Sequence, residues 1–328
     1  MPVLSVENLS IGFSTPEGFG KAVDDVSFSI EPNETLGIVG ESGCGKTVTA
    51  LSVLRLIQEP PGKITGGRIM FEGQDLLSLP ADELRKIRGN RIAMIFQEPM
   101  TALNPVFTVG DQIGEVFRLH KGDSKKEARD KAIGMLAQVG IPAAEKRVDD
   151  YPHQLSGGMR QRAMIAMALA CNPAILIADE PTTALDVTIQ AQILELMENL
   201  KNKFATSIIL ITHDLGVVAQ HAQKVAVMYA GKIVESCSVS QIFANPLHPY
   251  TVGLMESIPA ITDEEGDDRK RLREIPGIVP PLHAMPRGCR FNPRCAHVMD
   301  ICKTVEPQLV AVSPGHLCAC HLHSAEAR

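Results

Sequence analysis

Apolar and polar side chains alternate in short runs over residues 2–40. The alternation is interrupted at Glu17-Gly18 and at Pro32-Asn33, where the residue types favour turns. Alternation with a period of two is typical of half-buried strands. The segment therefore predicts strands with a hairpin-like start, followed by a buried strand at Leu36–Val39.

A helical period begins after this strand. Over Thr47–Ile57 the apolar residues recur at three-residue spacing, which places them on one face of a helix. These residues are Val48, Leu51, Leu54 and Ile57. Pro60-Pro61-Gly62 then predicts the end of the helix. Strand, glycine-rich turn and helix thus follow one another in this order.

The middle of the chain combines helical and strand patterns. Residues between Phe107 and Tyr151 are rich in charged and helix-forming side chains, especially over Lys125–Gln138, and predict a small helical insertion. Two apolar runs, Ile175–Ala178 and Ile208–Ile211, predict interior strands of a parallel sheet. Strands that alternate with helices predict an α/β fold.

The composition changes after Ile242. Proline becomes frequent, a charged patch at Asp263–Glu274 predicts a linker, and five of the eight cysteines fall in the last 40 residues. We therefore expect a first domain over residues 1–242, with a helical subdomain at about 98–157, and a C-terminal extension over residues 243–328.

Composition and charge exclude several classes of protein. The chain has 328 residues, 45% of them hydrophobic and 21% charged, which is typical of a folded globular protein. Its 32 Lys+Arg and 38 Asp+Glu give a net charge of −6, which excludes a basic nucleic-acid binder by bulk charge. No apolar run approaches the ~18 residues of a membrane span. The N-terminus shows no secretory signal, so the cytoplasm is the expected compartment.

Gly40-Glu41-Ser42-Gly43-Cys44-Gly45-Lys46-Thr47 fits the pattern G-x-x-x-x-G-K-[ST] of a phosphate loop. Glycines let successive backbone N–H groups point at phosphate oxygens, while Lys46 reaches the β- and γ-phosphates and the Thr47 hydroxyl binds Mg²⁺. The following helix adds its positive N-terminal end. We expect Ser42–Val48 to bind a nucleoside triphosphate, with the Cys44 thiol incidental. The alternative is a glycine-rich turn at a helix start.

The apolar run Ile175–Ala178 ends in two acids, Asp179 and Glu180. At the end of a buried strand the first can hold the hydration shell of Mg²⁺, and the second can orient or deprotonate an attacking water. By themselves, two acids after a strand more often indicate a solvated loop or a helix cap. Together with the phosphate loop they predict a nucleoside triphosphatase.

Further short motifs follow the phosphate loop in a fixed order. They are Gln97, Leu155-Ser156-Gly157-Gly158-Met159, Asp179-Glu180, Ala184-Leu185-Asp186 and Ile211-Thr212-His213-Asp214. Each is weak alone, but their order and spacing resemble those of ABC-transporter ATPases over most of residues 3–240. The resemblance implies the P-loop fold of that family, with a parallel-sheet core, a β-rich N-terminal subdomain and a helical insertion.

The resemblance also implies a head-to-tail dimer, in which ATP lies between the phosphate loop of one protomer and the Ser-Gly-Gly segment of the other. Ser156, Gly157 and Gly158 would then contact the γ-phosphate of the nucleotide on the opposite protomer, through N–H groups at a helix start. Asp186 would lie at the dimer contact. One copy of the motif set therefore implies a second ATPase subunit.

Within one protomer the resemblance assigns separate roles. It makes Glu180 the catalytic carboxylate, His213 the switch residue on the γ-phosphate, and Gln97 the ligand of Mg²⁺ and water whose loop senses the membrane subunit. Phe13 is expected to stack on adenine, with Phe19 as a competitor and simple packing of both rings as the alternative. The expected Mg²⁺ ligands are Thr47, Gln97 and Asp179.

Three features resemble the oligopeptide-type importer ATPases in particular. They are Met159, where Gln is usual in the wider family, Glu98-Pro99-Met100-Thr101-Ala102-Leu103-Asn104-Pro105 and Asn245-Pro246-Leu247-His248-Pro249-Tyr250-Thr251. That group covers importers of dipeptides, oligopeptides, nickel and glutathione. The implied function is ATP hydrolysis that powers import of dipeptides or oligopeptides, with another substrate of the group as the alternative. The implied place is the cytoplasmic face of the bacterial inner membrane, with a related second ATPase chain, two permease subunits and a substrate-binding protein.

Two other classes of protein are the alternatives. A soluble ABC ATPase that acts on nucleic acid or ribosomes would need two motif sets, long insertions or a basic surface, and the sequence has none of these. A metal-cluster regulatory module with a vestigial nucleotide site would not need intact Lys46, Asp179, Glu180 and His213. No nucleic-acid partner is therefore expected.

The tail cysteines follow the spacing Cys289-x5-Cys295-x6-Cys302-x17-Cys320, with Cys318 two residues before the last. In a reducing cytosol such clustering indicates a metal site before it indicates disulfides. Four thiolates suit a [4Fe-4S] cluster or zinc, and the spacing matches neither small zinc sites nor the bacterial ferredoxin run. The tail resembles the C-terminal extension of peptide-importer ATPases, some of which carry a [4Fe-4S] cluster, so that cluster is expected, with zinc and free packed thiols as alternatives. Cys320 is preferred to Cys318 because Ala319-Cys320-His321 is closer to the family's ending.

Overall fold

The computed structural model describes residues 1–98, 102–183, 185–257 and 274–323. Three sequence predictions lie partly outside these residues: the Glu98–Pro105 stretch at 99–101, the Ala184-Leu185-Asp186 motif at Ala184, and the linker at Asp263–Glu274 up to residue 273. The chain forms two compact units. Unit 1 comprises residues 1–4, 29–35 and 70–211, and unit 2 comprises residues 5–28, 36–69 and 212–328.

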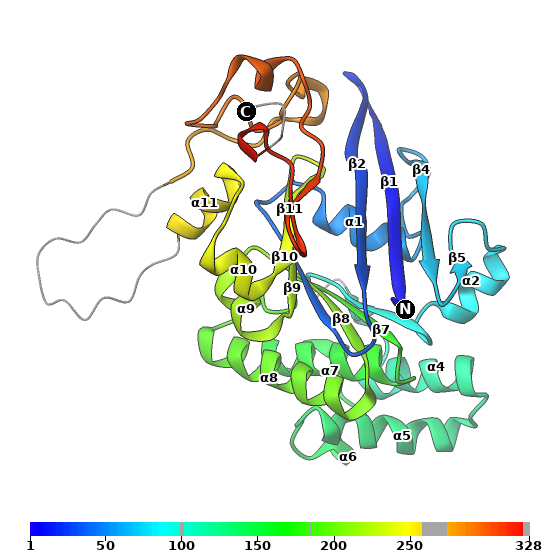
Figure 1. Ribbon diagram of the computed structural model, residues 1–328. Coiled ribbons are helices and arrows are strands. Elements are labelled where there is room, and N and C mark those ends of the chain that lie inside the picture. Colours follow the sequence, from blue (N-terminus) through cyan, green and yellow to red (C-terminus); the bar gives the residue numbers. More distant parts are fainter. Residues whose placement is uncertain (99–101, 184, 258–273, 324–328) are drawn as a thin grey trace, which may run out of the picture. The chain divides into compact units, whose positions relative to one another are not determined.

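The N-terminal strands form one sheet in which β1 lies between β2 and β4 (Figure 1). β1 (Leu4–Thr15) and β2 (Gly18–Ile30) are joined by a short turn, and β4 (Gly62–Phe71) lies on the other side of β1. Val6 and Leu9 are both buried although they are three residues apart, because Asn8, with a φ of 51°, adds an extra residue between them. The predicted hairpin-like start is confirmed.

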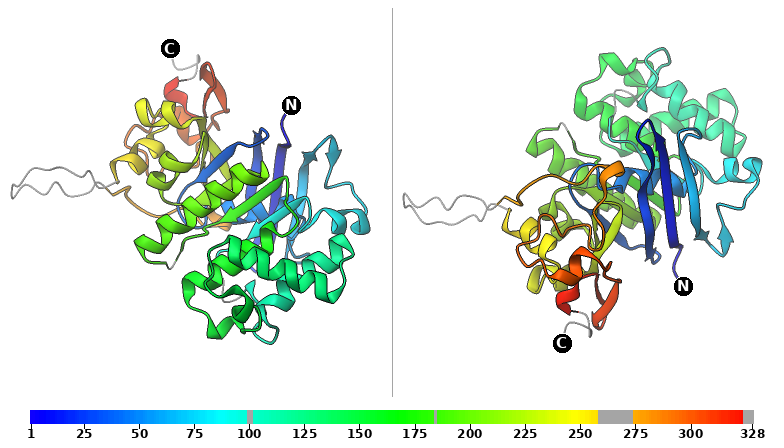
Figure 2. Two further views of the ribbon diagram at one scale, coloured as in Figure 1. Left: turned by 90° about the horizontal axis from the view of Figure 1, so that it is seen from below. Right: turned by 90° about the horizontal axis from the view of Figure 1, so that it is seen from above.

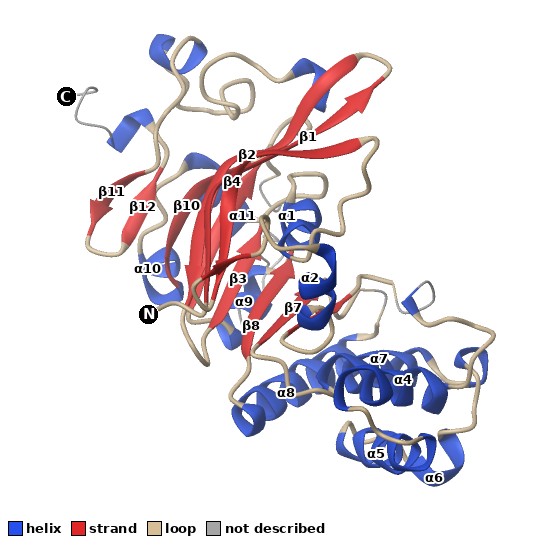
Figure 3. Cartoon of the chain, turned by 90° about the vertical axis from the view of Figure 1, so that its right-hand side faces the viewer, coloured by secondary structure: helices blue, strands red, loops and turns tan. Residues whose placement is uncertain are grey.

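A second sheet contains both the phosphate-loop strand and the C-terminal strands. β3 (Thr35–Val39) pairs in parallel with β9 (Lys224–Tyr229), which pairs antiparallel with β10 (Lys232–Ser238). β12 (His316–Cys318) follows β10, and β11 (Val310–Ser313) pairs with β12 at the edge (Figure 3). The C-terminal extension therefore supplies two strands of the sheet that contains β3 and β9.

The helices of unit 2 are short. They are α1 (Lys46–Val53), α9 (Leu215–His221), α10 (Val239–Ala244) and α11 (Pro249–Glu256), with 3-10 turns at Leu282–Ala284, Asp300–Lys303 and His321–His323. An aromatic cluster ties them to the sheet: the ring centroid of Tyr229 on β9 lies 4.7 Å from that of Tyr250 on α11 and 5.1 Å from that of Phe291. All three rings are buried. The C-terminal segment around Phe291 is thus part of the core of unit 2.

The parallel strands of unit 1 form its core. β6 (Ile92–Ile95), β7 (Ile175–Asp179) and β8 (Ser207–Thr212) pair in the order β6–β7–β8, and every residue of the three strands is buried. The interior parallel strands predicted at Ile175–Ala178 and Ile208–Ile211 are therefore confirmed. Unit 1 also contains β5 (Gln74–Asp75), α2 (Ala81–Ile87), α7 (Gly157–Leu169), which packs against β6, and α8 (Val187–Phe204).

A helical insertion follows β6 in unit 1, as the sequence predicts. α4 (Val109–Lys121) and α5 (Lys125–Gln138) pack side by side, followed by α6 (Ala144–Arg147) and a 3-10 turn at Pro152–Gln154 (Figure 2). Ser124 and Glu127 form a capping box at the start of α5, and this helix covers the helix-forming run Lys125–Gln138. None of the helices in the described part of the chain has the length and apolarity needed to cross a bilayer.

The helix predicted over Thr47–Ile57 is shorter than expected, since α1 ends at Val53. Arg55 adopts a left-handed φ of 49°, its N–H donates to Ser52 O at 2.9 Å, and the N–H of Leu56 donates to Leu51 O at 2.8 Å. This pair of bonds is a Schellman motif, which satisfies the last carbonyls of a helix. The apolar spacing continued past the helix because Leu54 is buried by the turn itself.

Candidate functional site

The phosphate loop leaves the end of β3 and enters α1 in unit 2. Gly40 has a φ of 154° and Gly45 a φ of 104°, conformations that favour glycine. A Cβ atom at Gly40 would lie 2.2 Å from the carbonyl oxygen of Met228, and one at Gly45 would lie 2.7 Å from that of Ala22. Both positions therefore exclude any side chain.

The side chain of Lys46 is hydrogen-bonded to two carbonyl oxygens of the phosphate loop. Lys46 is buried, and its Nζ donates to Gly40 O at 2.7 Å and to Glu41 O at 3.0 Å. Ser42 and Gly43 lie exposed at the loop tip, and Thr47 is exposed at the start of α1. An exposed turn of backbone N–H groups before a helix start is the arrangement that binds phosphate, and an exposed hydroxyl beside it is a ligand type that Mg²⁺ accepts.

The other two loop residues predicted to contact nucleotide are less exposed. Cys44 is buried, and burial raises the pKa of its thiol, so the thiol stays protonated inside the protein. Val48 is half-buried in the first turn of α1. At these positions only main-chain groups are suited to a phosphate, which agrees with an incidental role for the Cys44 thiol.

In unit 1 the two acids follow β7. Asp179 is the last residue of the strand and is buried, whereas Glu180 has a left-handed φ of 46° and turns out of the strand line. The Nε2 atom of Gln97 donates to Glu180 Oε2 at 3.1 Å, and Thr183 Oγ1 donates to the same oxygen at 2.8 Å. The structure thus brings the predicted catalytic carboxylate and Gln97 together.

The Ser-Gly-Gly segment is the N-terminus of α7 in unit 1. Ser156 is the N-cap residue, and its hydroxyl accepts the N–H of Met159 at 3.3 Å. Ser156 and Gly157 are exposed. A Cβ atom at Gly158 would lie 3.1 Å from Ile189 Cγ2, so this position leaves little room for a side chain. An exposed, capped N-terminus of a 13-residue helix presents N–H groups and positive dipole to an anion.

The remaining predicted residues lie at exposed places. His213 follows β8 in unit 2, next to Asp214, which caps α9 by accepting the N–H of Gly216 at 2.7 Å. Asp186 caps α8 in unit 1 by accepting the N–H of Ile189 at 2.9 Å. Phe19 is 54% exposed on β2, whereas Phe13 is half-buried on β1.

Four tail cysteines lie around one pocket in unit 2. Cys289, Cys295, Cys302 and Cys320 line one small pocket, together with His248, Phe291, His297 and His321. The N–H of Cys289 donates to Cys302 O at 2.8 Å, which joins two of the segments. Burial raises the pKa of Cys289 and of Cys320 to about 11. Burial alone favours the neutral thiols, so the four sulfurs would ligate a metal only after releasing their protons, and they are the soft donor type that iron and zinc accept.

Cys318 faces a different group. It lies opposite Glu235 in the β10–β12 ladder, and donor atoms of Glu235, Cys237 and His316 lie within 4.8 Å of one another there. The Glu235 carboxylate accepts the N–H groups of Leu247 and His248, each at 2.8 Å, and its Oε1 lies 2.7 Å from His316 Nε2. Because these contacts already satisfy the carboxylate, this group joins the C-terminal strand to β10 without needing a metal.

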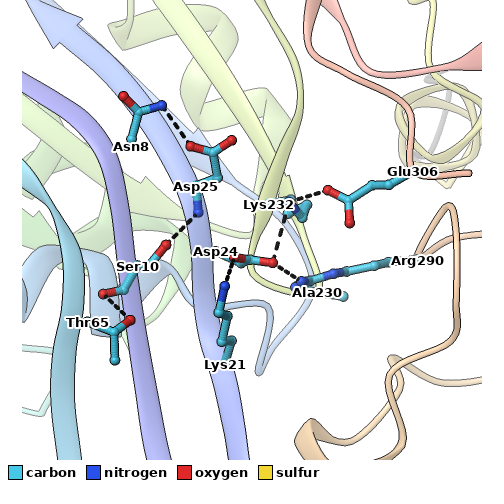
Figure 4. A network of polar contacts seen from close by, with 10 residues as sticks. All are labelled: Asn8, Ser10, Lys21, Asp24, Asp25, Thr65, Ala230, Lys232, Arg290 and Glu306. Carbon is cyan, nitrogen blue, oxygen red and sulfur yellow. Dashed lines mark hydrogen bonds and ion pairs between the residues drawn. The ribbon is translucent and has the colours of Figure 1, made fainter.

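Charged side chains anchor the first cysteine of the pocket. Arg290, the next residue after Cys289, donates to Asp24 on β2 and to a main-chain carbonyl of the β9–β10 turn (Figure 4). Lys232 on β10 pairs with the same aspartate and with Glu306. Partial burial raises the pKa of Asp24, but the hydrogen bond from Lys21 and the charges of Lys232 and Arg290 outweigh it and lower that pKa. This anchor holds the cysteine segment on the strands of unit 2.

Comparison with known proteins matches both parts of the chain. Residues 23–183 match the ABC transporter family, and residues 234–302 match the C-terminal region of oligopeptide/dipeptide transporters. The oligopeptide transport ATP-binding protein AppD of Bacillus subtilis is 53% identical over 324 residues, which cover 99% of this chain and 98% of that protein. A relative from Sinorhizobium fredii, "Probable peptide ABC transporter ATP-binding protein y4tR", is 53% identical over 318 residues, which cover 97% of this chain and 94% of that protein.

Solved structures agree in fold. The dimeric ATP-binding cassette MJ0796, in a post-hydrolysis state bound to ADP and Pi, has a TM-score of 0.65 and 28% identity, and the match covers 72% of this chain and 98% of that chain. The protein cbiO1 of Clostridium perfringens, part of the ABC transporter complex cbiONQ, has a TM-score of 0.62 and 26% identity, with 74% and 91% covered. The chain therefore belongs to the ATP-binding proteins of ABC transporters, within the oligopeptide/dipeptide group, and has their ATPase cassette fold.

Proposed function

We propose that this chain is the ATP-hydrolysing subunit of an importer of dipeptides or oligopeptides. The ordered motif set supports ATP hydrolysis, and the 53% identity to an oligopeptide transport ATP-binding protein over 99% of the chain supports the substrate class. Nickel and glutathione, which other members of the group import, are the competing substrates. The proposed place is the cytoplasmic face of the inner membrane, where two permease subunits hold the chain and a binding protein delivers the substrate.

In this proposal the phosphate loop binds ATP. The main-chain N–H groups of the exposed residues Ser42 and Gly43 would cradle a β-phosphate, and the Lys46 ammonium, which donates to Gly40 O, would reach the phosphates from the base of the loop. Phe13 stacks on adenine, although the greater exposure of Phe19 keeps it a competitor. Thr47, Gln97 and Asp179 hold Mg²⁺, which neutralises charge on the transferred phosphoryl group when bound.

Glu180 is the proposed catalytic carboxylate. Its Oε2 atom accepts hydrogen bonds from Gln97 and Thr183, so the side chain is held in one orientation before any substrate arrives. A carboxylate held in this way can orient the attacking water and accept its proton. His213 is the proposed switch residue on the γ-phosphate.

A second ATPase subunit completes the site. Ser156, Gly157 and Gly158 would contact the γ-phosphate of the nucleotide bound to the other subunit, and Asp186 would lie at the contact between the subunits. The exposed N-terminus of α7 supports this role. The related cassette MJ0796 is dimeric in its solved structure, which supports pairing. The proposed mate is a related chain.

The tail carries the proposed metal centre. Cys289, Cys295, Cys302 and Cys320 would ligate a [4Fe-4S] cluster, with zinc as the competing occupant, and their position around one pocket supports a shared centre. Such a centre would stabilise a C-terminal segment whose described residues include few buried apolar side chains besides the cysteines. Iron and sulfide analysis of protein purified without oxygen distinguishes the cluster from zinc.

The observation that carries the proposed function is the phosphate loop between β3 and α1, closed by Lys46. The test is Glu180→Gln, with Glu195→Gln as its matched control because Glu195 is an exposed acid on α8. Glu180→Gln is expected to lower ATP hydrolysis by about 10²–10⁴-fold while ATP binding persists, and the control is expected to keep the parent rate. A parent rate in Glu180→Gln would remove the catalytic assignment. Uptake of labelled dipeptides, competed by nickel or glutathione, then tests the substrate class.

A further inference from the structure

A residue of the C-terminal region holds the second residue of the phosphate loop. Arg294 Nη1 donates to Glu41 Oε2 at 2.6 Å, and Arg294 Nη2 donates to Glu41 Oε1 at 2.9 Å. The two residues are 253 positions apart in the chain, and both belong to unit 2. A two-pronged pair of this kind fixes the orientation of a carboxylate as well as its position.

The pair lies in a protected environment. The Arg294 side chain is 4% exposed, and its guanidinium carbon lies 5.7 Å from the ring centroid of Tyr229 and 6.0 Å from that of Phe291. Its Nε donates to Pro276 O at 2.8 Å. The hydrogen bonds to Glu41 raise the pKa of Arg294, so the guanidinium stays charged. Breaking such a pair leaves a buried charge, whereas an exposed pair contributes little.

The main chain of Glu41 is held as well. Its N–H donates to the hydroxyl oxygen of Tyr250 at 2.8 Å, and its carbonyl oxygen accepts the Lys46 ammonium at 3.0 Å. Tyr250 is buried, so its hydroxyl cannot follow a moving loop. Any displacement of Glu41 therefore displaces one of the two carbonyls that hold Lys46.

We infer that Arg294 is a positioning residue for the phosphate loop. It fixes the position of Glu41, and the Glu41 carbonyl oxygen in turn fixes the position of the Lys46 ammonium that contacts the nucleotide. The inference rests on the proposed role of the loop in binding ATP. Arg294 immediately precedes Cys295, one of the cysteines around the pocket. The C-terminal extension thus acts on nucleotide affinity as well as on the sheet edge that it completes.

The test measures ATP affinity and loop mobility in the full-length chain. Arg294→Met keeps the apolar stem and removes the charge, whereas Arg294→Lys keeps the charge and removes the two-pronged geometry. Each variant is made in the Glu180→Gln background so that ATP is not consumed. The dissociation constant for Mg-ATP and the hydrogen exchange of main-chain amides 40–46 are measured together with the melting temperature.

The expected result is a dissociation constant about tenfold higher in Arg294→Met, faster exchange at Glu41, and an intermediate value in Arg294→Lys. The matched control is Arg129→Met, which breaks another two-pronged pair, with Asp149 at 2.6 and 2.7 Å, far along the chain in the helical insertion. This control is expected to keep the parent affinity and exchange. Arg294→Met with parent affinity and parent exchange, and only a lower melting temperature, would overturn the inference.

Two further variants keep the outcome decisive. Glu41→Gln weakens the same contact from the loop side, so it tests the inference if the Arg294→Met protein does not fold. If the Glu41→Gln protein binds Mg-ATP with the parent affinity, the inference is overturned. Lys46→Ala separates this inference from the proposed function. If Lys46→Ala keeps the parent affinity, the loop is not the nucleotide site; if it abolishes binding while the Arg294 and Glu41 variants bind normally, only the positioning role fails.

Discussion

The phosphate loop and the cysteine pocket are the two ligand sites that we propose within unit 2, and they are built by opposite means. The loop uses eight consecutive residues, Gly40–Thr47, and would bind phosphate through its main-chain N–H groups. Its glycines set the directions of these N–H groups, and Lys46 donates a hydrogen bond back to the carbonyl oxygen of Gly40. The pocket uses side chains of cysteines spread from Cys289 to Cys320. A site made by the backbone can be formed by one short stretch of sequence. A site made by side chains depends on every chain segment that contributes one of those side chains.

The two sites should therefore respond differently to substitution. In the loop, a single carbon atom added at Gly40 or Gly45 is enough to displace the backbone, because a carbonyl oxygen lies against each of these glycines. In the pocket, losing one sulfur leaves the rest of the segment anchored by Arg290 and Arg294. We expect the larger effect on ligand binding from the smaller chemical change.

The largest effect is predicted for Gly40→Ala. The new Cβ atom would lie 2.2 Å from the Met228 carbonyl oxygen at a left-handed φ of 154°. Strain and clash together should weaken ATP binding by about 100-fold. Gly66→Ala is the matched control, because a Cβ atom there meets no atom within 4 Å. Titration with Mg-ATP measures both, and equal affinity in the two variants would contradict the backbone account of the loop.

The next effect is predicted for Cys302→Ser. Removing one of four thiolates should lower the metal retained per chain by about tenfold or more after gel filtration. Cys171→Ser is the matched control, since Cys171 is equally buried but lies in unit 1, away from the pocket. Iron, zinc and sulfide analysis gives the readout. A Cys302→Ser protein that keeps the parent metal content would show that the pocket does not hold a metal through this residue.

The same measurement separates Cys318 from Cys320. Cys320 lines the pocket, whereas Cys318 lies opposite Glu235 in the strand pair. Cys320→Ser should therefore lose metal as Cys302→Ser does, and Cys318→Ser should keep it. The reverse pattern would make Cys318 the fourth ligand.

A stability effect is predicted for Glu235→Gln. The buried carboxylate accepts two main-chain N–H groups and lies 2.7 Å from His316 Nε2, and an amide cannot accept at both ends. The free energy of unfolding should fall by about 1–3 kcal/mol in urea. Asp149→Asn, at an exposed ion pair with Arg129, should cost about 1 kcal/mol or less. Equal losses would contradict the view that Glu235 joins the C-terminal strand to β10.

The smallest effect is predicted for Phe13→Leu. Loss of stacking on adenine should raise the dissociation constant for ATP by about fivefold, since an aromatic contact of this kind contributes on the order of 1 kcal/mol. Phe19→Leu serves as the comparison on the neighbouring strand. If Phe19→Leu weakens binding and Phe13→Leu does not, the adenine contact belongs to Phe19.

Much of the fold is encoded in local patterns. The helix at Lys125–Gln138 lies within the predicted helical insertion and starts where Ser124 and Glu127 cap it, and the parallel strands follow from unbroken apolar runs. The helix after the phosphate loop was predicted too long, because the apolar spacing continues through a Schellman turn that no proline or glycine marks. Patterns of hydrophobicity report burial, and burial can continue where a helix has ended.

The candidate site also has some parts that the sequence predicts and others that only the folded chain reveals. The phosphate loop and Asp179-Glu180 are contiguous, so their chemistry can be predicted from a few letters of sequence. Arg294 gave no such signal, because its partner Glu41 lies 253 residues away and only the folded chain brings them together. Tyr250 lies in the Asn245–Thr251 stretch that the sequence analysis used only to assign the subgroup. Its contact with the Glu41 N–H gives that stretch a physical role.

The central claim is that the loop closed by Lys46 holds ATP for capping by a second ATPase subunit. The most direct measurement is the molar mass in solution, by light scattering, of the Glu180→Gln chain alone and mixed with its cognate second ATP-binding subunit. With Mg-ATP we predict a shift from monomers to dimers in at least one of these samples, and no shift when Lys46→Ala is added. Monomers at saturating Mg-ATP in both samples would contradict the account.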